Sequence, residues 1–205
     1  MFIINDRIAT LIRLQRTWLK GSTTEDIQHL YYKSCTIDFK AVLPHIKTPP
    51  ESILDIGAGM GGVDVLLFKH FGGTPDLVLL DADKVDAEIS YGFSARASVY
   101  SKKSEVKEFL IGNGVPRKKF NLVKNFPDPS HKFDLITSFI SCGFHYPLSV
   151  YMSNIIKGIK PEGVLILDIR KDITAQFDML HDKFRFVDTI QDNKTYKKVV
   201  CRNQK

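Results

Sequence analysis

Long apolar runs are missing from this 205-residue sequence. No uninterrupted apolar stretch approaches the length of about 18 residues that a membrane-spanning helix needs. The apolar residues at the N-terminus, Met1 to Ile4, are soon followed by the charged residues Asp6 and Arg7. That pattern does not fit the apolar core of a signal peptide. We therefore expect neither a membrane span nor a signal peptide.

Cysteine is scarce, with only Cys35, Cys142 and Cys201 in the chain. The three are odd in number and far apart, and no C-x-x-C pair or neighbouring histidine pair accompanies them. This usage favours reduced thiols and a cytoplasmic protein, and it predicts no metal site. We expect Cys142 to be a small packing residue.

Internal repeats, long linkers and low-complexity tracts are also absent. The length is therefore most simply explained by a single domain, residues 1–205, with a sizeable core. The net charge of +6 is the one feature of the composition that points to nucleic acid. Because the excess is spread over residues 102–119 and the tail 194–205, a solvated surface explains it better, and a nucleic-acid partner is possible but not favoured.

One stretch combines a buried strand, a glycine-rich turn and a helix. The apolar run 53–56 is typical of a strand at the centre of a parallel sheet, and a helix is expected from Val63. The glycines between them allow a sharp turn and a close approach to a ligand. They fit two motifs, G-x-G-x-x-G for a dinucleotide at 57, 59 and 62, and D-x-G-x-G-x-G for S-adenosylmethionine at 55, 57, 59 and 61.

Asp55 favours the second motif, because an acid two residues before the first glycine suits a cationic amino-acid ligand. On these residues the chain resembles the class I S-adenosylmethionine-dependent methyltransferases, and K-P-x-G at 160–163 is a second point of similarity. Asp81, at the end of the next expected strand, is placed to bind ribose hydroxyls. The resemblance implies S-adenosyl-L-methionine as cofactor, with the binding residues Asp55, Gly57, Ala58, Gly59, Gly61, Asp81, Ala82 and Ser138.

The periodicity of the chain predicts alternating strands and helices. Strands are expected at 53–56, 77–80, 120–123, 133–140, 164–167, 184–190 and 196–201. Helices are expected at 4–19, from residue 24 through Tyr31 and Tyr32, at 38–45, 63–71, 104–111, 151–159 and 173–180. A tight turn is expected at 160–163 and a hairpin turn at 192–194. Residues 86–100 give no clear signal.

The expected fold is α/β: a Rossmann-like, doubly wound, mostly parallel seven-stranded sheet that ends in an antiparallel C-terminal hairpin. Residues 51–205 would form the cofactor-binding core, and helices in residues 1–50 would cover the ligand end of the sheet. Tyr31 and Tyr32 would then face the cofactor or substrate. Packing of both rings between the cover and the sheet is the alternative.

The segment after the fourth strand, residues 141–147, carries the candidate for chemistry. It would lie beside the crevice in which open α/β sheets bind ligands. His145 has an ordinary pKa of about 6.5 and suits a general base that removes a proton from a hydroxyl. The segment is similar to the corresponding loop of small-molecule, including sugar, O-methyltransferases. Tyr146 and Arg170 are further candidates for substrate binding, although His145 also fits a structural role and Arg170 a surface ion pair.

The reaction expected from the resemblance is methyl transfer to a small-molecule hydroxyl. The family's Asn/Asp-Pro-Pro-aromatic motif for base amines is missing, and only Asn121, Asn125 and Asp128 follow the third strand where an adenine-binding acid is common. Two alternatives remain open. The basic charge allows an RNA methyltransferase or an RNA-binding relative, and the glycine motif allows an NAD-dependent oxidoreductase, which lacks support from a Ser/Tyr-x-x-x-Lys pattern.

Overall fold

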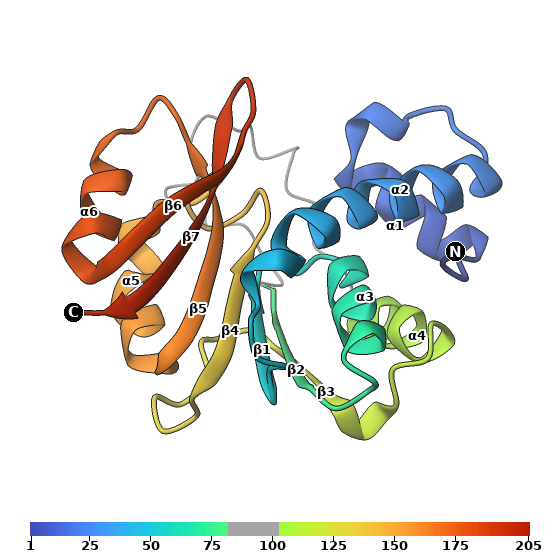
Figure 1. Cartoon of the computed structure of the whole chain (residues 1–205). Helices are drawn as coiled ribbons and strands as arrows, with labels where there is room; N and C mark the ends of the chain where they lie inside the picture. The colour runs from blue at the N-terminus through green and yellow to red at the C-terminus, as the bar shows by residue number, and fades with distance from the viewer. Residues whose placement is uncertain (82–102) are drawn as a thin grey trace.

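The computed structural model describes residues 1–81 and 103–205 of the chain. These residues form a seven-stranded sheet in the order β3-β2-β1-β4-β5-β7-β6 (Figure 1). The strands are β1 (Ser52–Ile56), β2 (Asp76–Leu80), β3 (Phe120–Val123), β4 (Phe133–Ser138), β5 (Ile159–Arg170), β6 (Phe184–Asp192) and β7 (Tyr196–Gln204). Ala82 and the unassigned segment 86–100 lie outside the described residues.

The sheet is parallel from β3 to β5 and antiparallel at its C-terminal hairpin. The order reverses between β1 and β4, which are paired neighbours, with Ile53 opposite Leu135 and Asp55 opposite Thr137. Open α/β sheets bind ligands outside the carboxyl ends of the strands at such a switch point. The expected mostly parallel sheet with an antiparallel hairpin is confirmed.

Helices lie on both faces of the sheet, as Figure 1 shows, with α1 to α4 on one side and α5 and α6 on the other. They are α1 (Asp6–Gln15), α2 (Thr24–Val42), α3 (Gly62–His70), α4 (Lys103–Gly112), α5 (Leu148–Gly158) and α6 (Ala175–Lys183), with short 3₁₀ turns at Thr17–Leu19, Leu43–His45 and Arg117–Lys119. Alternate strand residues fill the two resulting cores: Ile53, Leu77 and Leu135 face the first, and Leu54, Val78 and Ile136 the second. Because side chains on both faces of these strands are buried, the strands consist of continuous apolar runs.

The N-terminal cover differs in two respects from the sequence-based expectation. The helix expected at 4–19 ends at Gln15, and a 3₁₀ turn at Thr17–Leu19 follows it. Instead of a separate helix beginning near Asp38, α2 continues to Val42. Thr23 and Asp26 form a capping box at its start, and neither proline nor glycine interrupts the helix before Pro44. The long helix results because its buried residues share one side over its whole length: Ile27, Tyr31, Cys35 and Val42.

Two boundaries near β4 and β5 also differ. The turn expected at 160–163 lies within β5, where the pairing with β4 shifts register between Phe133 and Leu135. A bulge therefore takes up the Lys-Pro-Glu-Gly segment without ending the strand. The expected strand 133–140 ends at Ser138, because the backbone of Ile140 is left-handed with φ of 55°.

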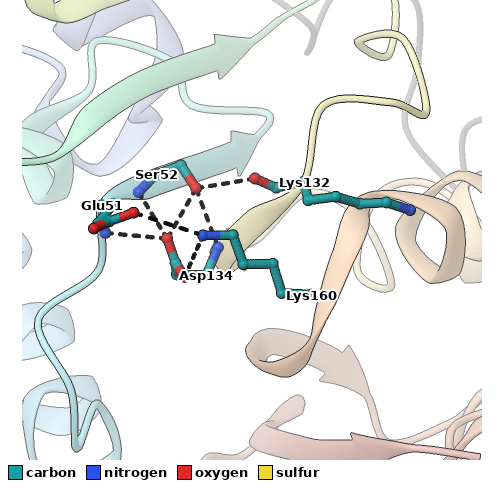
Figure 2. A network of polar contacts seen from close by, with 5 residues as sticks. All are labelled: Glu51, Ser52, Lys132, Asp134 and Lys160. Carbon is teal, nitrogen blue, oxygen red and sulfur yellow. Dashed lines mark hydrogen bonds and ion pairs between the residues drawn. The ribbon is translucent and has the colours of Figure 1, made fainter.

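Polar side chains join the amino-terminal ends of β1, β4 and β5 (Figure 2). Asp134 accepts hydrogen bonds from the Ser52 backbone N–H and hydroxyl, both at 3.0 Å, and from Lys160 Nζ at 2.7 Å. The Ser52 hydroxyl is also 3.0 Å from the carbonyl oxygen of Lys132. These contacts fix the end of the sheet opposite to the switch-point crevice. Within the described ranges, no helix is long and apolar enough to cross a membrane.

Candidate cofactor and acceptor site

The glycine turn between β1 and α3 has the backbone shape that the motif predicts. Gly57, Gly59 and Gly61 have φ values of 76°, 56° and 75°, in the left-handed region that side chains other than glycine rarely adopt. The Gly57 N–H donates to the Leu80 carbonyl at 2.7 Å, and the Ala58 N–H donates to the same oxygen at 3.4 Å. The turn is thereby fixed against the carboxyl end of β2.

Glycine is also required at position 57 because the segment that follows β4 comes very close to it. A Cβ added at Gly57 would overlap the hydroxyl of Ser141. The contact places the glycine turn directly beside residues 141–147. The glycine turn and the segment that carries His145 and Tyr146 therefore meet at the switch point.

Asp55 occupies a buried position under the turn, and its contact with the cofactor stays a prediction. Its side chain is 4% exposed and accepts a hydrogen bond from the Thr137 hydroxyl at 3.0 Å. Burial, then the charge of Asp64 and a hydrogen bond to it, raise the pKa of Asp55 well above its usual range. Asp64, in the first turn of α3, is buried too, and burial raises its pKa to about 6. Two buried carboxyl groups side by side resist ionising together, so the pair holds a proton more tightly than an isolated carboxyl group does.

Asp81 immediately follows β2 and is partly exposed at the carboxyl end of the sheet. Its backbone N–H donates to the Val123 carbonyl at 3.1 Å, which fixes the residue between β2 and β3. Burial raises the pKa of Tyr151 on α5 to about 12, with smaller contributions from Cys142, Tyr146 and Asp81. Tyr151 therefore lies in the electrostatic range of Asp81 and joins this side of the site.

Backbone hydrogen bonds give residues 141–147 a defined conformation. The Ser141 carbonyl accepts from the N–H groups of Phe144, His145 and Tyr146 at 3.0, 2.8 and 3.1 Å. The Gly143 carbonyl accepts from the Arg170 N–H at 3.0 Å and from Gln176 Nε2 at 3.0 Å. We call residues 141–147 the acceptor loop.

Ser138 supports the acceptor loop from the end of β4. Its hydroxyl donates to the Ile56 carbonyl at 2.7 Å and accepts from the Cys142 N–H at 2.9 Å, and the side chain is fully buried. Through these two bonds Ser138 joins the end of β1 to the acceptor loop, and its contact with the cofactor stays a prediction. Cys142 is buried and packs in the second core, as expected.

His145 is half-buried in the acceptor loop and lies among aromatic rings. The Phe144 ring packs edge-on against it at 4.8 Å and also against Tyr196 at 5.8 Å. Burial, together with the nearby charge of Arg170, lowers the pKa of His145 to about 4. The ordinary pKa expected from the sequence is therefore wrong for this environment. The ring is neutral at pH 7, but it is a weaker base than an ordinary histidine.

The other predicted acceptor residues have mixed surroundings. Arg170 makes an ion pair with Asp172 at 2.6 Å, as the salt-bridge alternative anticipates, and its guanidinium lies 5.7 Å from the centre of the Phe144 ring. Tyr146 is partly exposed, and its carbonyl accepts from the Gly143 N–H at 2.8 Å. Both residues belong to the immediate neighbourhood of His145.

Tyr31 lies at the cofactor side of the molecule but is only 4% exposed. It packs against Phe2 and Phe109, and its hydroxyl lies against Gly62, at the start of α3, 2.7 Å from where a Cβ of that residue would be. Tyr32 is partly buried, with its ring 5.1 Å from that of Phe2. The burial of Tyr31 fits the packing alternative, whereas a contact of Tyr32 with the substrate stays a prediction.

Several residues that lie near these candidates were not found from the sequence: Asp64, Tyr151, and the buried ion pair of Asp168 and Lys198, whose Oδ1 and Nζ atoms are 2.7 Å apart. A signal existed for two of them. Asp64 is the acid in an otherwise apolar helix start, and Lys198 shares the inward-facing alternation of β7 with the buried Val200. The sequence pattern does not reveal that Lys198 pairs with Asp168, because the two residues lie on different strands.

Comparison with known proteins gives structural matches only. No family model matches the sequence, and no curated protein is similar to it. A T. thermophilus 16S rRNA methyltransferase solved with AdoMet and guanosine matches with a TM-score of 0.56 and 16% identity, over 82% of this chain and 42% of that one. Human methyltransferase-like protein 13, solved with SAH, matches with a TM-score of 0.56 and 14% identity, over 84% of this chain and 81% of that one. Human N-acetylserotonin methyltransferase, solved with SAM, matches with a TM-score of 0.55 and 13% identity, over 85% of this chain and 54% of that one.

These matches confirm the resemblance at the level of the fold. The chain has the class I S-adenosylmethionine-dependent methyltransferase fold, with the glycine turn at its switch point. It spans less than two thirds of the rRNA and N-acetylserotonin enzymes. Within the described parts of the chain, no group of three or more His, Cys, Asp or Glu side chains is arranged to hold a metal ion.

Proposed function

We propose that this protein is an S-adenosylmethionine-dependent methyltransferase that acts on a hydroxyl group of a small molecule. The observation that carries the proposal is the left-handed glycine turn at 57, 59 and 61, placed between β1 and α3 at the switch point. Three left-handed glycines carry an entropic cost, and at the switch point they leave backbone N–H groups close to where a ligand would bind.

The chain's own groups fit this cofactor. The N-terminus of α3, directly after the turn, attracts an anionic group such as the carboxylate of the amino-acid part. Asp81, at the end of the adjacent strand, would accept hydrogen bonds from the ribose hydroxyls. Asp55 would act from below by holding the turn, since its carboxyl group is buried with Asp64 and Thr137. When bound, the cofactor supplies an activated methyl group.

The acceptor would lie between the glycine turn and the acceptor loop. Alignment of a reactive group can contribute about 7–11 kcal/mol to lowering a barrier in favourable cases. His145 would accept the hydroxyl proton, because its lowered pKa of about 4 keeps the ring neutral at pH 7. Its neighbours Tyr146 and Arg170 would orient the acceptor.

Calorimetry with S-adenosylhomocysteine tests the cofactor assignment. Wild type should bind it with micromolar affinity, and Asp81→Ala should weaken binding at least about tenfold, the loss of one good hydrogen bond to a charged group. Asp76→Ala is the matched control, because Asp76 lies at the other end of β2 in an exposed pair with Lys119. The proposal fails if folded wild-type protein does not bind S-adenosylhomocysteine.

Substitution of Gly57 provides a second test of the same site. Gly57→Val should abolish binding, because a side chain would overlap Ser141 and strain the turn. Gly72→Val is the control for strain alone: Gly72 also has a positive φ, of 65°, but no other group lies within 4 Å of its Cβ position. Equal loss of binding in both variants would remove the special role of Gly57.

The acceptor can be sought directly by mass spectrometry of a cell extract incubated with the enzyme and isotopically methyl-labelled cofactor. The net charge of +6 keeps an RNA acceptor, or RNA binding without catalysis, as the second candidate. RNA binding would then weaken steeply with added salt. An NAD-dependent oxidoreductase would instead be stabilised against heat by NAD and not by S-adenosylmethionine.

A further inference from the structure

A buried ion network lies beside the acceptor loop and is not explained by cofactor binding. Lys198 of β7 is fully buried. Its Nζ lies 2.7 Å from Asp168 Oδ1 on β5 and 3.3 Å from Asp38 Oδ1 on α2. Charges removed from water are costly, and apolar replacements of such networks are often equally stable. Stability alone is therefore a weak explanation for this network.

The second oxygen of Asp168 holds the chain at the entrance to the acceptor loop. Asp168 Oδ2 accepts a hydrogen bond from the Ile140 N–H at 3.2 Å. Ile140 has a φ of 55°, and Asn203 is the other non-glycine residue with a positive φ among those described. This conformation is unfavourable for a β-branched residue, so it persists only where surrounding contacts impose it.

Lys198 also contacts the residue before Ile140. Its Nζ lies 4.2 Å from the centre of the Phe139 ring, within the range of a cation–π interaction. Two consecutive residues, Phe139 and Ile140, are therefore held by the same buried pair. The next residue is Ser141, which rests on Gly57 and whose carbonyl accepts the His145 N–H.

We propose that Asp168, anchored by Lys198, is a positioning residue that imposes the strained conformation of Ile140 and thereby sets the place of His145 in the acceptor loop. The catalytic meaning of this role rests on the proposed function. The geometric claim can be tested without cofactor or acceptor. Strain at this point is the kind of device that active sites use to fix a side chain.

The test is a titration of the His145 ring followed by NMR in protein labelled with ¹⁵N-histidine. The chain has six histidines, and His145→Gln identifies the signal. In both variant pairs compared, positions 168 and 198 are uncharged, and Asp38, which is partly exposed, loses Lys198 in each, so that loss is common to the two. D168N/K198M keeps an oxygen that can accept the Ile140 N–H, whereas D168L/K198M removes it.

The wild-type titration midpoint should be low, near the pKa of about 4 that burial and Arg170 produce. D168N/K198M should keep that midpoint. In D168L/K198M the loop should relax and the midpoint should rise by at least about 1 toward the ordinary value of about 6.5. A wild-type midpoint in folded D168L/K198M overturns the proposal, as does an equal rise in both pairs.

Two controls separate this effect from loss of stability and from folding failure. Asp134→Asn breaks the Lys160 pair at the opposite end of the sheet (Figure 2) and should leave the His145 midpoint unchanged. If leucine prevents folding, D168A/K198M also lacks the acceptor oxygen, with less bulk, and the same rise is expected. Failure of wild type to bind S-adenosylhomocysteine would remove the proposed function but would not affect this titration.

Discussion

The buried carboxyl groups of Asp55 and Asp64 interact beneath the glycine turn, and the charge of Asp64 helps to raise the pKa of Asp55. Asp55 is the penultimate residue of β1, and Asp64 lies in the first turn of α3. Because two adjacent buried carboxylates resist ionising together, we expect a proton shared between them to link the two elements on either side of the turn. Loss of that proton would place two negative charges at the base of the turn.

The effect of Asp64→Asn on stability, measured relative to wild type, should be more favourable in alkaline than in acidic solution. The pKa values of both carboxyls are raised above the ordinary 3.8 in the folded state, that of Asp64 to about 6. Their favourable contribution is therefore complete below about pH 4 and is lost as the pH rises through 6. Asparagine at position 64 cannot ionise, so the variant does not lose the part of the stability that depends on the protonation of Asp64.

Urea unfolding at pH 5 and pH 8 provides the measurement. The change in unfolding free energy caused by Asp64→Asn should be more favourable by about 1 kcal/mol at pH 8 than at pH 5. Asp76→Asn, at an exposed ion pair, should show no comparable difference. An Asp64→Asn effect that is equal at both pH values would contradict the shared proton.

Asp134→Asn should destabilise the fold without affecting the site. Although burial raises the pKa of Asp134, hydrogen bonds from Lys160 and Ser52 outweigh it and hold that pKa below its usual range. The stabilising contribution is thus present above about pH 4 and is lost as the pH falls through the lower, folded-state value. We expect a loss of about 1–2 kcal/mol at pH 7, measured by chemical denaturation.

The expected loss should shrink at pH 3, and affinity for S-adenosylhomocysteine should match wild type. Asp128→Asn is the control, since Asp128 is exposed and bonds only locally, to Ser130. A similar loss of stability in both variants would indicate that the network in Figure 2 has no special role.

Local patterns explain why most of the sheet could be predicted. Apolar runs such as 53–56 and 77–80 are buried on both faces, and their ends are marked by glycine or acid. The spacing of the glycines also predicts the backbone shape of the turn, because the positive φ values at positions 57, 59 and 61 favour glycine. Boundaries that depend on partners were missed: the bulge at 160–163 is defined by pairing with β4.

Side-chain roles were harder to predict because they depend on burial and on distant residues. Asp55 has the family's position, but in its environment burial and the charge of Asp64 raise its pKa, whereas the hydrogen bond from Thr137 lowers it. His145 was assigned an ordinary pKa, whereas burial and Arg170 lower it to about 4. The spacing of residues along the chain does not reveal how deeply a group is buried. Nor does it reveal which charged groups from other elements lie beside it.

Gly62→Ala should be destabilising even though alanine is the better helix former. A Cβ at Gly62 would lie 2.5 Å from Cys35 Sγ and 2.7 Å from the Tyr31 hydroxyl. Helix α2 would have to move away from the start of α3. Overpacking of this kind costs about 1–3 kcal/mol, which exceeds the gain of about 1 kcal/mol from helix propensity.

Gly112→Ala is the matched substitution, because Gly112 ends α4 with no group within 4 Å of its Cβ position. It should be neutral or stabilising by up to about 1 kcal/mol. Thermal unfolding of both variants distinguishes the two situations. Equal effects would mean that α2 does not press on the start of α3 as closely as the structure shows.

Substitution of His145 should separate catalysis from cofactor binding. If His145 is the base, His145→Ala should lower turnover of the identified acceptor by about 100- to 10,000-fold. Affinity for S-adenosylhomocysteine should change little, because the ring lies in the acceptor loop and not in the glycine turn. Single-turnover rates and calorimetry give the two values.

The pH dependence of the wild-type reaction provides the complementary evidence for His145. Because the ring must be neutral to accept a proton, the single-turnover rate should rise with pH through a midpoint near the lowered pKa of about 4, not near 6.5. His145→Ala should lose this limb of the profile. Tyr146→Phe is the control, since it alters a neighbouring residue of the same loop and should preserve the limb. If His145→Ala instead loses cofactor affinity and turnover together, the histidine supports the loop and a different group must take the proton.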